Sequence, residues 1–179
     1  MRYPYHIWPS ALSEEVIDNI VTHAETVHAQ KAQLFSSADS LSSQRSSQVR
    51  WLTASWISDL ILPYAKQANE SFKIDFENDI EMQFTDYLAS EQGHYDWHHD
   101  VNWHSQSDRD RKLSVTIQLS DGDSYEGGDF EFEEIITNTN FRAKGTILIF
   151  PSYLRHRVTT VTKGRRRSLV AWYSGPNWQ

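Results

Sequence analysis

From residue 73 onward, apolar residues alternate with polar ones in a series of short segments. The alternating apolar positions are Ile74 and Phe76; Ile80, Met82 and Phe84; Leu113, Val115, Ile117 and Leu119; Phe130 and Phe132; Ile147 and Ile149; Val158 and Val161; Leu169, Ala171 and Tyr173. A period of two is typical of β-strands with one buried face. Glycine-containing turn sequences separate the segments at residues 121–122, 126–128, 144–145 and 163–164. Many short strands with regular turns predict an antiparallel jelly roll, or double-stranded β-helix, over about residues 73–176.

The residues before this region have helical patterns instead. Residues 13–27 place apolar side chains at helical spacing, and Glu14, Glu15 and Asp18 lie where they favour the helix dipole. Residues 51–72 return to helical spacing, although Pro63 must either kink this helix or open a second one. We therefore expect two or more packing helices over about residues 10–72. The expected fold class is mainly β (α+β), in a single domain that spans residues 1–179.

A polar segment, residues 33–50, lies between the two helical patterns. It is rich in serine and has almost no apolar periodicity, which predicts a long loop. Loops of this length are uncommon in compact domains and are often functional. Two interpretations stay open: a lid over a site, or an ordinary surface loop.

The composition limits the possible classes of protein. A chain of 179 residues with 39% hydrophobic and 13% aromatic residues is too rich in apolar side chains to be disordered. No window approaches the roughly 18 consecutive apolar residues of a membrane span. The first residues lack the apolar core of a signal peptide. We expect a soluble, cytoplasmic protein without a membrane partner.

Charge and cysteine content narrow the chemistry further. The formal net charge of -7 argues against a general nucleic-acid binder, because phosphate neutralisation needs a surplus of lysine and arginine. The chain has no cysteine, so neither a disulfide framework nor a thiolate zinc site can form. Any bound metal must therefore be held by histidines and carboxylates.

The sequence His98-His99-Asp100 is the first candidate for a site. In a strand, His98 and Asp100 would share one face while His99 points away. His156 follows 58 residues after His98 (156 − 98), just beyond the apolar run 147–151, where a jelly roll returns to the same mouth. Two histidines and one carboxylate are the facial ligand set of non-haem Fe(II), which leaves positions open to substrate and oxygen. We predict His98, Asp100 and His156 as iron ligands.

Arg166 is the second candidate. Alternation along its strand puts Ser168 and Trp172 on the same face. A guanidinium beside a hydroxyl suits bidentate binding of a carboxylate, which suggests 2-oxoglutarate as a cosubstrate of the iron site. The alternative is that Arg166 is a surface arginine in a solvated hairpin with its basic neighbours Arg155, Arg157, Lys163, Arg165 and Arg167.

Taken together, these stretches resemble the Fe(II)/2-oxoglutarate-dependent dioxygenases, and within them the prolyl 4-hydroxylases and the bacterial PKHD-type hydroxylases. The resemblance covers about residues 80–176, with a weaker match at 50–52. It is carried by residues 95–100, by 113–120 with 125–128, and by 150–166. It implies hydroxylation of an unactivated C–H bond with release of succinate and CO2. The implied cofactors are Fe(II), 2-oxoglutarate and O2, with ascorbate as a reductant.

The same resemblance implies roles for individual residues. Iron would bind His98, Asp100 and His156, and Arg166 would hold the distal carboxylate of 2-oxoglutarate with help from Ser168. Tyr87 matches a tyrosine that also contacts the cosubstrate, and Trp172 matches a residue that walls its pocket. Gln118 stands where many prolyl hydroxylases have a tyrosine for the same carboxylate, so we expect this contact to be altered.

The substrate is the least constrained part. Four residues next to the metal motif are candidates for the substrate entrance, although the aromatic ones could equally be packing residues: Tyr95, Trp97, Asn102 and Trp103. Residues 33–50 and 108–112 could close over an extended peptide. The resemblance favours a prolyl residue of a peptide or protein, and a free amino acid or another small molecule stays open.

Two other classes of function also stay open. One is a non-catalytic jelly-roll binding module that has lost turnover. The other is a cupin-type metal enzyme without 2-oxoglutarate. Arg166 distinguishes the two kinds of enzyme, because only a carboxylate cosubstrate requires this arginine. A nucleic-acid demethylase is disfavoured by the acidic balance, and we expect no nucleic-acid partner.

Overall fold

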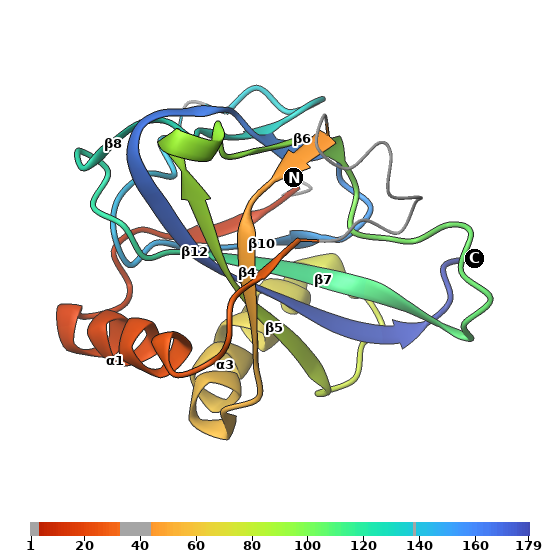
Figure 1. Ribbon diagram of the computed structural model, residues 1–179. Helices are drawn as coiled ribbons and strands as arrows, with labels where there is room; N and C mark the ends of the chain where they lie inside the picture. Colours follow the sequence, from red (N-terminus) through yellow and green to blue (C-terminus); the bar gives the residue numbers. More distant parts are fainter. Residues whose placement is uncertain (1–3, 33–43, 138) are drawn as a thin grey trace.

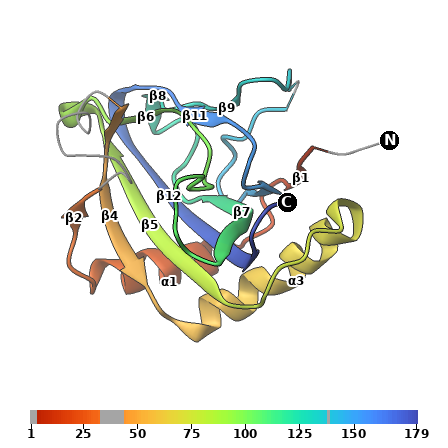
Figure 2. The same cartoon turned by 90° about the vertical axis from the view of Figure 1, so that its right-hand side faces the viewer.

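The computed structural model describes residues 4–32, 44–137 and 139–179, which form two antiparallel sheets and two helices (Figures 1 and 2). The main sheet has, in spatial order, β1 (His6–Trp8), β10 (Ile147–Pro151), β7 (Arg109–Gln118), β12 (Val161–Pro176), β5 (Ile80–Leu88), β4 (Gln48–Leu52) and β2 (Gln30–Lys31). A short strand, β8 (Tyr125–Gly127), pairs with one end of β12. The minor sheet has the order β3 (Arg45–Ser46), β6 (His94–His98), β11 (His156–Val158) and β9 (Phe130–Phe132). The double-sheet jelly roll expected from the alternation is confirmed.

The two helices cover the outer face of the main sheet, and the minor sheet lies on its other side (Figure 2). Helix α1 (Glu14–Glu25) begins after Ser13, whose hydroxyl accepts a hydrogen bond from the Val16 amide. Helix α3 spans Ser55–Phe72. Both helices bury one apolar stripe at helical spacing: Ile17, Ile20 and Ala24 in α1, and Ile57, Ile61, Ala65 and Ala68 in α3. A 3-10 turn, η2 (Ala89–Glu91), follows β5.

Strand β12 links this core to the space between the sheets. Its residues Leu169, Ala171 and Tyr173 belong to the apolar core shared with the helices. Successive side chains of a strand point to opposite faces, so the residues between them face the minor sheet. The burial of one face therefore fixes which side chains of β12 can reach a site.

Part of the segment expected to be a loop is strand. Residues 33–43 lie outside the described residues, so the expectation of a lid is not tested there. Residues 45–46 and 48–52, however, form β3 and β4, and α3 begins at Ser55 rather than at residue 51. Strand β4 pairs in register with β5, from Gln48 opposite Asp86 to Leu52 opposite Met82. This pairing decides the conformation where the local sequence has no clear period.

Three further details can be compared with the sequence expectations. Pro63 lies inside α3, so of the two expected alternatives it does not open a second helix; its side chain is exposed. Ile74 and Phe76 are not in a strand: α3 ends at Lys73 in a left-handed conformation (φ 54°), and Phe76 packs on the Tyr173 ring at 5.1 Å. Most of the 108–112 segment, expected to cover a peptide, belongs to β7, which begins at Arg109.

No helix in the described part of the chain has the length and apolar character needed to cross a membrane.

Candidate metal and carboxylate site

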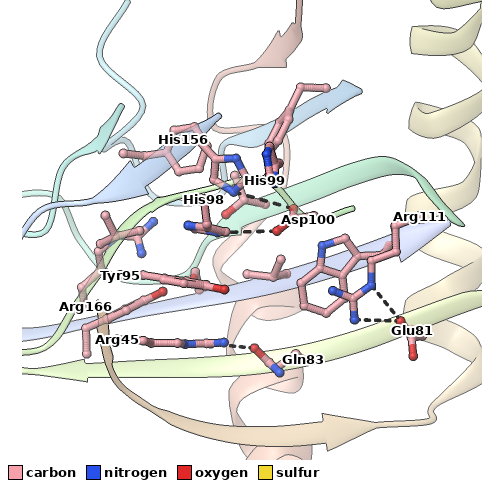
Figure 3. Close-up of a pocket in the computed structure, with 18 of the residues that line it drawn as sticks. Arg45, Glu81, Gln83, Tyr95, His98, His99, Asp100, Arg111, His156 and Arg166 are labelled. Atoms are coloured by element: carbon pink, nitrogen blue, oxygen red, sulfur yellow. Dashed lines mark hydrogen bonds and ion pairs between the residues drawn. The ribbon is translucent and has the colours of Figure 1, made fainter. Parts of the chain in front are cut away.

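A cavity of about 280 Å³ lies between the two sheets (Figure 3). The main sheet supplies the alternate residues of β12 that face away from the helices, namely Arg166, Ser168, Val170 and Trp172. The minor sheet supplies His98 and His156, and Asp100 follows directly after β6. The cavity thus brings together the two groups of residues that the sequence singled out separately.

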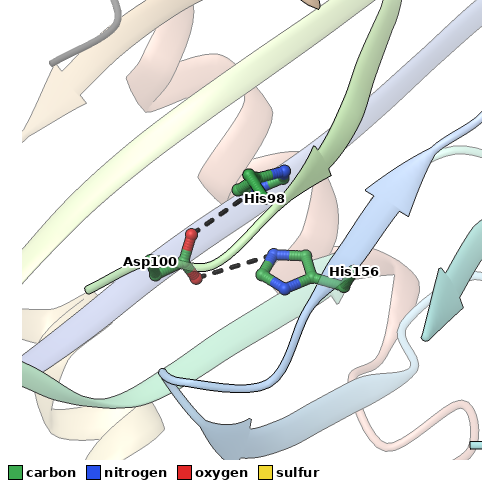
Figure 4. A group of neighbouring side chains, drawn as sticks. All are labelled: His98, Asp100 and His156. Carbon is green, nitrogen blue, oxygen red and sulfur yellow. Dashed lines mark ion pairs between the residues drawn. The ribbon is translucent and has the colours of Figure 1, made fainter. Parts of the chain in front are cut away.

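His98, Asp100 and His156 form a compact cluster at this cavity (Figure 4). His98 ends β6 and His156 begins β11, and the two residues are opposite each other in the register. The Asp100 carboxylate lies between them, with Oδ1 at 3.5 Å from His98 Nε2 and Oδ2 at 3.6 Å from His156 Nε2. The three possible ligand atoms lie within 4.8 Å of one another. The side chains are only 8%, 5% and 6% exposed, in chain order.

Hydrogen bonds orient both imidazoles. The Nδ1 atom of His98 lies 2.7 Å from the Asp96 carbonyl oxygen, and that of His156 lies 2.9 Å from the Leu154 carbonyl oxygen. Because a carbonyl can only accept, each Nδ1 carries the proton and each Nε2 keeps a lone pair that faces the carboxylate. The ring of Tyr95 stacks on His98 at 3.4 Å and fixes its plane.

The electrostatics favour a neutral His156 beside an ionised Asp100. Burial, reinforced by the neighbouring His98, lowers the pKa of His156 to about 4. Burial by itself opposes ionisation of Asp100, but attraction to the neighbouring His156, His98 and Arg111 holds the pKa of Asp100 well below its usual range. Burial also raises the pKa of Tyr95 to about 12, so its hydroxyl stays protonated. At neutral pH the cluster therefore offers the neutral nitrogen of His156 and the ionised carboxylate of Asp100, with His98 Nε2 beside them.

This donor set fits a divalent non-haem iron site. Two imidazole nitrogens and one carboxylate on one side leave the remaining positions directed into the cavity. His99 is not part of the cluster, which agrees with the sequence expectation. The expectation that its side chain points away from the site is wrong, because His99 lines the same cavity. The strand β6 ends at His98, so alternation no longer governs the residues that follow.

Arg166 has the surroundings of a carboxylate-binding residue. It is 4% exposed, and no carboxylate among the described residues lies within ion-pair distance of it. Its guanidinium carbon lies 5.4 Å from the centre of the Tyr87 ring, on the neighbouring strand β5. Ser168, two residues along the same face of β12, has an Oγ atom that is buried without a hydrogen-bond partner. A ligand with a carboxylate would satisfy the buried cation and this orphaned hydroxyl together.

The basic neighbours of Arg166 behave differently. Each of them meets a carboxylate: Arg155 pairs with Glu133, Arg157 with Glu131, Lys163 with Glu126, Arg165 with Asp86, and Arg167 with Asp86 and Glu25. The interpretation of Arg166 as a surface arginine is therefore wrong, because Arg166 is buried, whereas carboxylates match the charges of these five neighbours.

A glycine turn makes room for Arg166. Gly128 has a left-handed conformation (φ 64°), which costs little only for glycine. A Cβ atom at Gly128 would lie 3.1 Å from Arg166 Cδ and 2.9 Å from Val161 Cγ2. The turn after β8 is thus shaped around the arginine side chain.

Not every predicted site residue reaches this cavity. Gln118 lines a neighbouring cavity of about 210 Å³, where its Nε2 donates a hydrogen bond to Tyr125 Oη at 2.8 Å; Arg166 lines both cavities. Among the substrate candidates, Tyr95 lines the main cavity, whereas Trp97, Asn102 and Trp103 are outside its lining. Trp103 is 51% exposed and contacts the edge of His99.

The cavity also has walls that the sequence reasoning missed. The polar and aromatic ones among them include Arg45, Trp51, Glu81, Gln83 and Arg111. Glu81 and Gln83 alternate with the buried Met82 and Phe84, so the period of β5 could have identified them. Arg111 could not be found this way, because the pairing of β7 with β12 shifts register and leaves Lys112 as an extra residue. Such a β-bulge changes the face of the sheet toward which the neighbouring side chains point.

Comparisons with known proteins give a consistent result. A model of the 2OG-Fe(II) oxygenase superfamily matches residues 82–174, just over half of the chain. A PKHD-type hydroxylase of Synechococcus sp. (strain CC9311) is 42% identical over 85 residues, which are 47% of this chain and 38% of that protein. A PKHD-type hydroxylase of Hyphomonas neptunium is 41% identical over 61 residues, 34% of this chain and 27% of that protein. The matches thus span well under half the length of these relatives.

Solved structures show the same fold. A prolyl-4-hydroxylase of Pseudomonas putida has a TM-score of 0.76 at 17% identity, over 96% of this chain and 92% of that one. A viral collagen prolyl hydroxylase from Paramecium Bursaria Chlorella virus-1, in complex with 2OG, has a TM-score of 0.71 at 17% identity, over 97% of each chain. A Trichoplax adhaerens prolyl hydroxylase, in complex with a hypoxia inducible factor peptide fragment, has a TM-score of 0.74 at 14% identity, over 95% of this chain and 83% of that one.

Proposed function

Because the chain belongs to the 2OG-Fe(II) oxygenase superfamily, we propose that it uses Fe(II) and 2-oxoglutarate to hydroxylate an unactivated C–H bond. The observation that carries the proposal is the pairing of the His98, Asp100 and His156 cluster with the uncompensated Arg166 in one cavity. A binding module that had lost turnover would need neither the cluster of metal-binding side chains nor a buried arginine without a carboxylate partner. A cupin-type enzyme without 2-oxoglutarate would have no use for Arg166.

The three clustered side chains would hold Fe(II) on one face, with the cavity on the other. The bound metal and cosubstrate would supply the oxidation: O2 and 2-oxoglutarate are consumed, one oxygen atom enters the C–H bond, the other enters succinate, and CO2 leaves. Ascorbate is the reductant that we expect to keep the iron ferrous between turnovers. The protein's contribution is positioning and the exclusion of water.

Arg166 would bind the distal carboxylate of 2-oxoglutarate through two parallel N–H groups. Ser168 Oγ lies two residues along the same face of β12 and would donate to the same ligand, which gives this orphaned hydroxyl a partner. Tyr87 packs beside the guanidinium, and Trp172 closes the cavity further along the strand. Gln118 would act through Tyr125 and the neighbouring cavity instead of touching the cosubstrate directly.

For the substrate we propose a prolyl residue of a peptide or protein. The support is the similarity to PKHD-type hydroxylases and to a prolyl hydroxylase described in complex with a peptide fragment. Tyr95 and Trp172 give the cavity aromatic walls against which a pyrrolidine ring can pack. A free amino acid is the second candidate, since the cavity also presents several charged side chains.

The first experiment is an anaerobic titration of the Fe(II)-loaded protein with 2-oxoglutarate, followed by the weak visible charge-transfer band of the chelate. We expect the band in the wild-type protein and a strongly weakened response in Arg166→Ala, because the carboxylate clamp is lost while the iron ligands remain. Arg109→Gln is the matched control, since Arg109 pairs with Glu77 outside the cavity.

Other outcomes would separate the alternatives. Iron binding without the band would favour the cupin-type enzyme, and absence of iron binding would favour the binding module. His156→Ala should lose iron, and full iron retention in that variant would remove the metal assignment. An unchanged affinity for 2-oxoglutarate in Arg166→Ala would remove the assignment of Arg166 as the carboxylate clamp.

A further inference from the structure

Arg45 shares a rare property with Arg166. Of the ten arginines in the described part of the chain, only these two form no ion pair with a carboxylate of the described residues, and both line the same cavity. The other eight are each paired: Arg50, Arg109, Arg111, Arg142, Arg155, Arg157, Arg165 and Arg167. The proposed cosubstrate accounts for Arg166 and leaves the charge of Arg45 unmatched.

The guanidinium of Arg45 is held in place by neutral partners. Its Nε donates to Ser47 Oγ and its Nη2 donates to Gln83 Oε1, both at 2.8 Å. Its carbon Cζ lies 4.4 Å from the centre of the Tyr95 ring, and that ring stacks on His98. A fixed, half-buried cation thus lies one aromatic ring away from a proposed iron ligand.

Glu81, the acidic side chain next along the same wall, is already engaged. It follows the same face of β5 as Gln83, roughly 7 Å further along the strand. Its Oε2 accepts two hydrogen bonds from Arg111, at 3.0 and 2.9 Å, and Arg111 in turn stacks on Trp172 at 3.7 Å. Figure 3 shows Arg45 with Gln83 and Arg111 with Glu81 as two separate pairs. Glu81 therefore neutralises Arg111 and not Arg45.

We propose that Arg45 binds a carboxylate of the substrate, close to the carbon that is hydroxylated. The inference rests on the proposed function and specifies its substrate class. Only two of the five N–H groups of Arg45 are used by described residues, so a carboxylate can take a bidentate bond from the others. The carboxylate has two possible sources: the free carboxyl group of an amino acid, or an acidic side chain beside the reactive residue of a peptide.

Calorimetry on the anaerobic protein loaded with Fe(II) and 2-oxoglutarate tests this directly, because binding is measured without turnover. Two pairs of probes differ only in the carboxylate: L-proline against L-prolinamide, and acetyl-Ala-Pro-Glu-amide against acetyl-Ala-Pro-Gln-amide. We expect the acid of one pair to bind about 10- to 100-fold more tightly than its amide, as a charge-assisted bond to arginine requires. The pair that shows the preference identifies the source of the carboxylate.

Arg45→Gln should abolish the preference while the charge-transfer band of the 2-oxoglutarate chelate remains. Arg109→Gln is again the matched control and should keep the preference. Equal binding, or no binding, of acid and amide in both pairs by the wild-type protein would overturn the assignment, as would a preference that survives in Arg45→Gln. Loss of the band in Arg45→Gln would place Arg45 in the cosubstrate site and would also overturn the assignment.

Absence of the band in the wild-type protein would contradict the proposed function, whereas the comparison of acids with amides reports on Arg45 separately.

Discussion

Two buried serines fix the carboxylate of Asp100. Ser114, on β7, donates a hydrogen bond from Oγ to Asp100 Oδ2 at 2.6 Å, and its Oγ also lies 2.9 Å from Ser152 Oγ. The carbonyl of Ser152 accepts a hydrogen bond from the Asp100 amide at 2.9 Å. Asp100 lies beyond the end of β6, so these bonds replace the strand pairing that would otherwise hold it. The central carboxylate of the cluster is therefore positioned by the main sheet.

We predict that Ser114→Ala weakens Fe(II) binding by roughly 10- to 100-fold, the usual cost of losing a partner that orients a metal ligand. The side chain is small and removes little packing, so the fold should persist. Anaerobic titration with Fe(II), with a coloured chelator as competitor, measures the affinity. Ser168 lies beside Arg166, at the proposed binding site for 2-oxoglutarate. Ser168→Ala should therefore leave Fe(II) affinity unchanged and weaken 2-oxoglutarate binding. An unaltered Fe(II) affinity in Ser114→Ala would show that Asp100 is positioned without it.

At the scale of elements, Asp86 ties three strands of the main sheet together. It is a fully buried residue of β5 that accepts hydrogen bonds from Arg50 of β4 and from Arg165 and Arg167 of β12. Burial alone would raise the pKa of Asp86, but the hydrogen bonds and charges of Arg165, Arg50 and Arg167 outweigh it and lower the pKa. A carboxylate with a lowered pKa stabilises the folded state above its unfolded pKa of about 3.9, and this contribution is lost as the pH falls through the folded pKa.

Asp86→Asn should therefore destabilise the protein by about 3 kcal/mol at pH 7, because it leaves three guanidinium groups beside a neutral amide. The difference in free energy of unfolding between the two proteins should become smaller as the pH falls from about 5 toward 3. In this range the wild-type protein itself loses the stabilisation that ionised Asp86 provides. Urea unfolding of both proteins at pH 7 and pH 3 gives the difference in free energy of unfolding. Other carboxylates titrate equally in the two proteins, so the difference isolates Asp86. A loss that is the same at both pH values would contradict the ionised assignment.

The sequence patterns predicted those elements whose one face is buried by the helices. In β12 the buried Leu169, Ala171 and Tyr173 fix the alternation, and the same alternation correctly places Arg166 on the cavity face. Such a pattern can be identified without knowing the partner strand. The iron and cosubstrate roles of the residues on that face stay predictions.

Other elements depend on contacts between distant segments. Strand β3 pairs at Arg45 with Tyr95, fifty residues later (95 − 45), and nothing near Arg45 in the sequence reports this pairing. Arg111 reaches the cavity because of a bulge at Lys112, which local alternation cannot indicate. Ile74 and Phe76 have strand spacing but find no partner strand, since they follow the end of α3 and pack on the core. The missed wall of the cavity thus consists largely of residues placed by tertiary pairing.

At the scale of the whole molecule, the site exists only when the two sheets are packed together. The minor sheet and the turn after it contribute His98, Asp100 and His156, whereas the main sheet contributes Arg166 and Ser114. The main sheet is in turn held against both helices by one continuous apolar core. We propose on this basis that residues 1–179 fold as one domain, and that ligands bridging the sheets stabilise all of it.

Ligand binding should consequently raise the temperature of a single unfolding transition. A ligand at 100 times its dissociation constant adds about 2.7 kcal/mol, and one kcal/mol corresponds to roughly 2–4 °C for a chain of this size, so we expect a shift of about 5–10 °C from each saturating ligand. Anaerobic calorimetric melting with Fe(II), and then with Fe(II) and 2-oxoglutarate, measures the two steps. Arg166→Ala should keep the step caused by iron and lose the step caused by 2-oxoglutarate. His156→Ala should lose both. Two separate transitions would contradict the single domain, and equal iron stabilisation of His156→Ala and the wild-type protein would place the metal elsewhere.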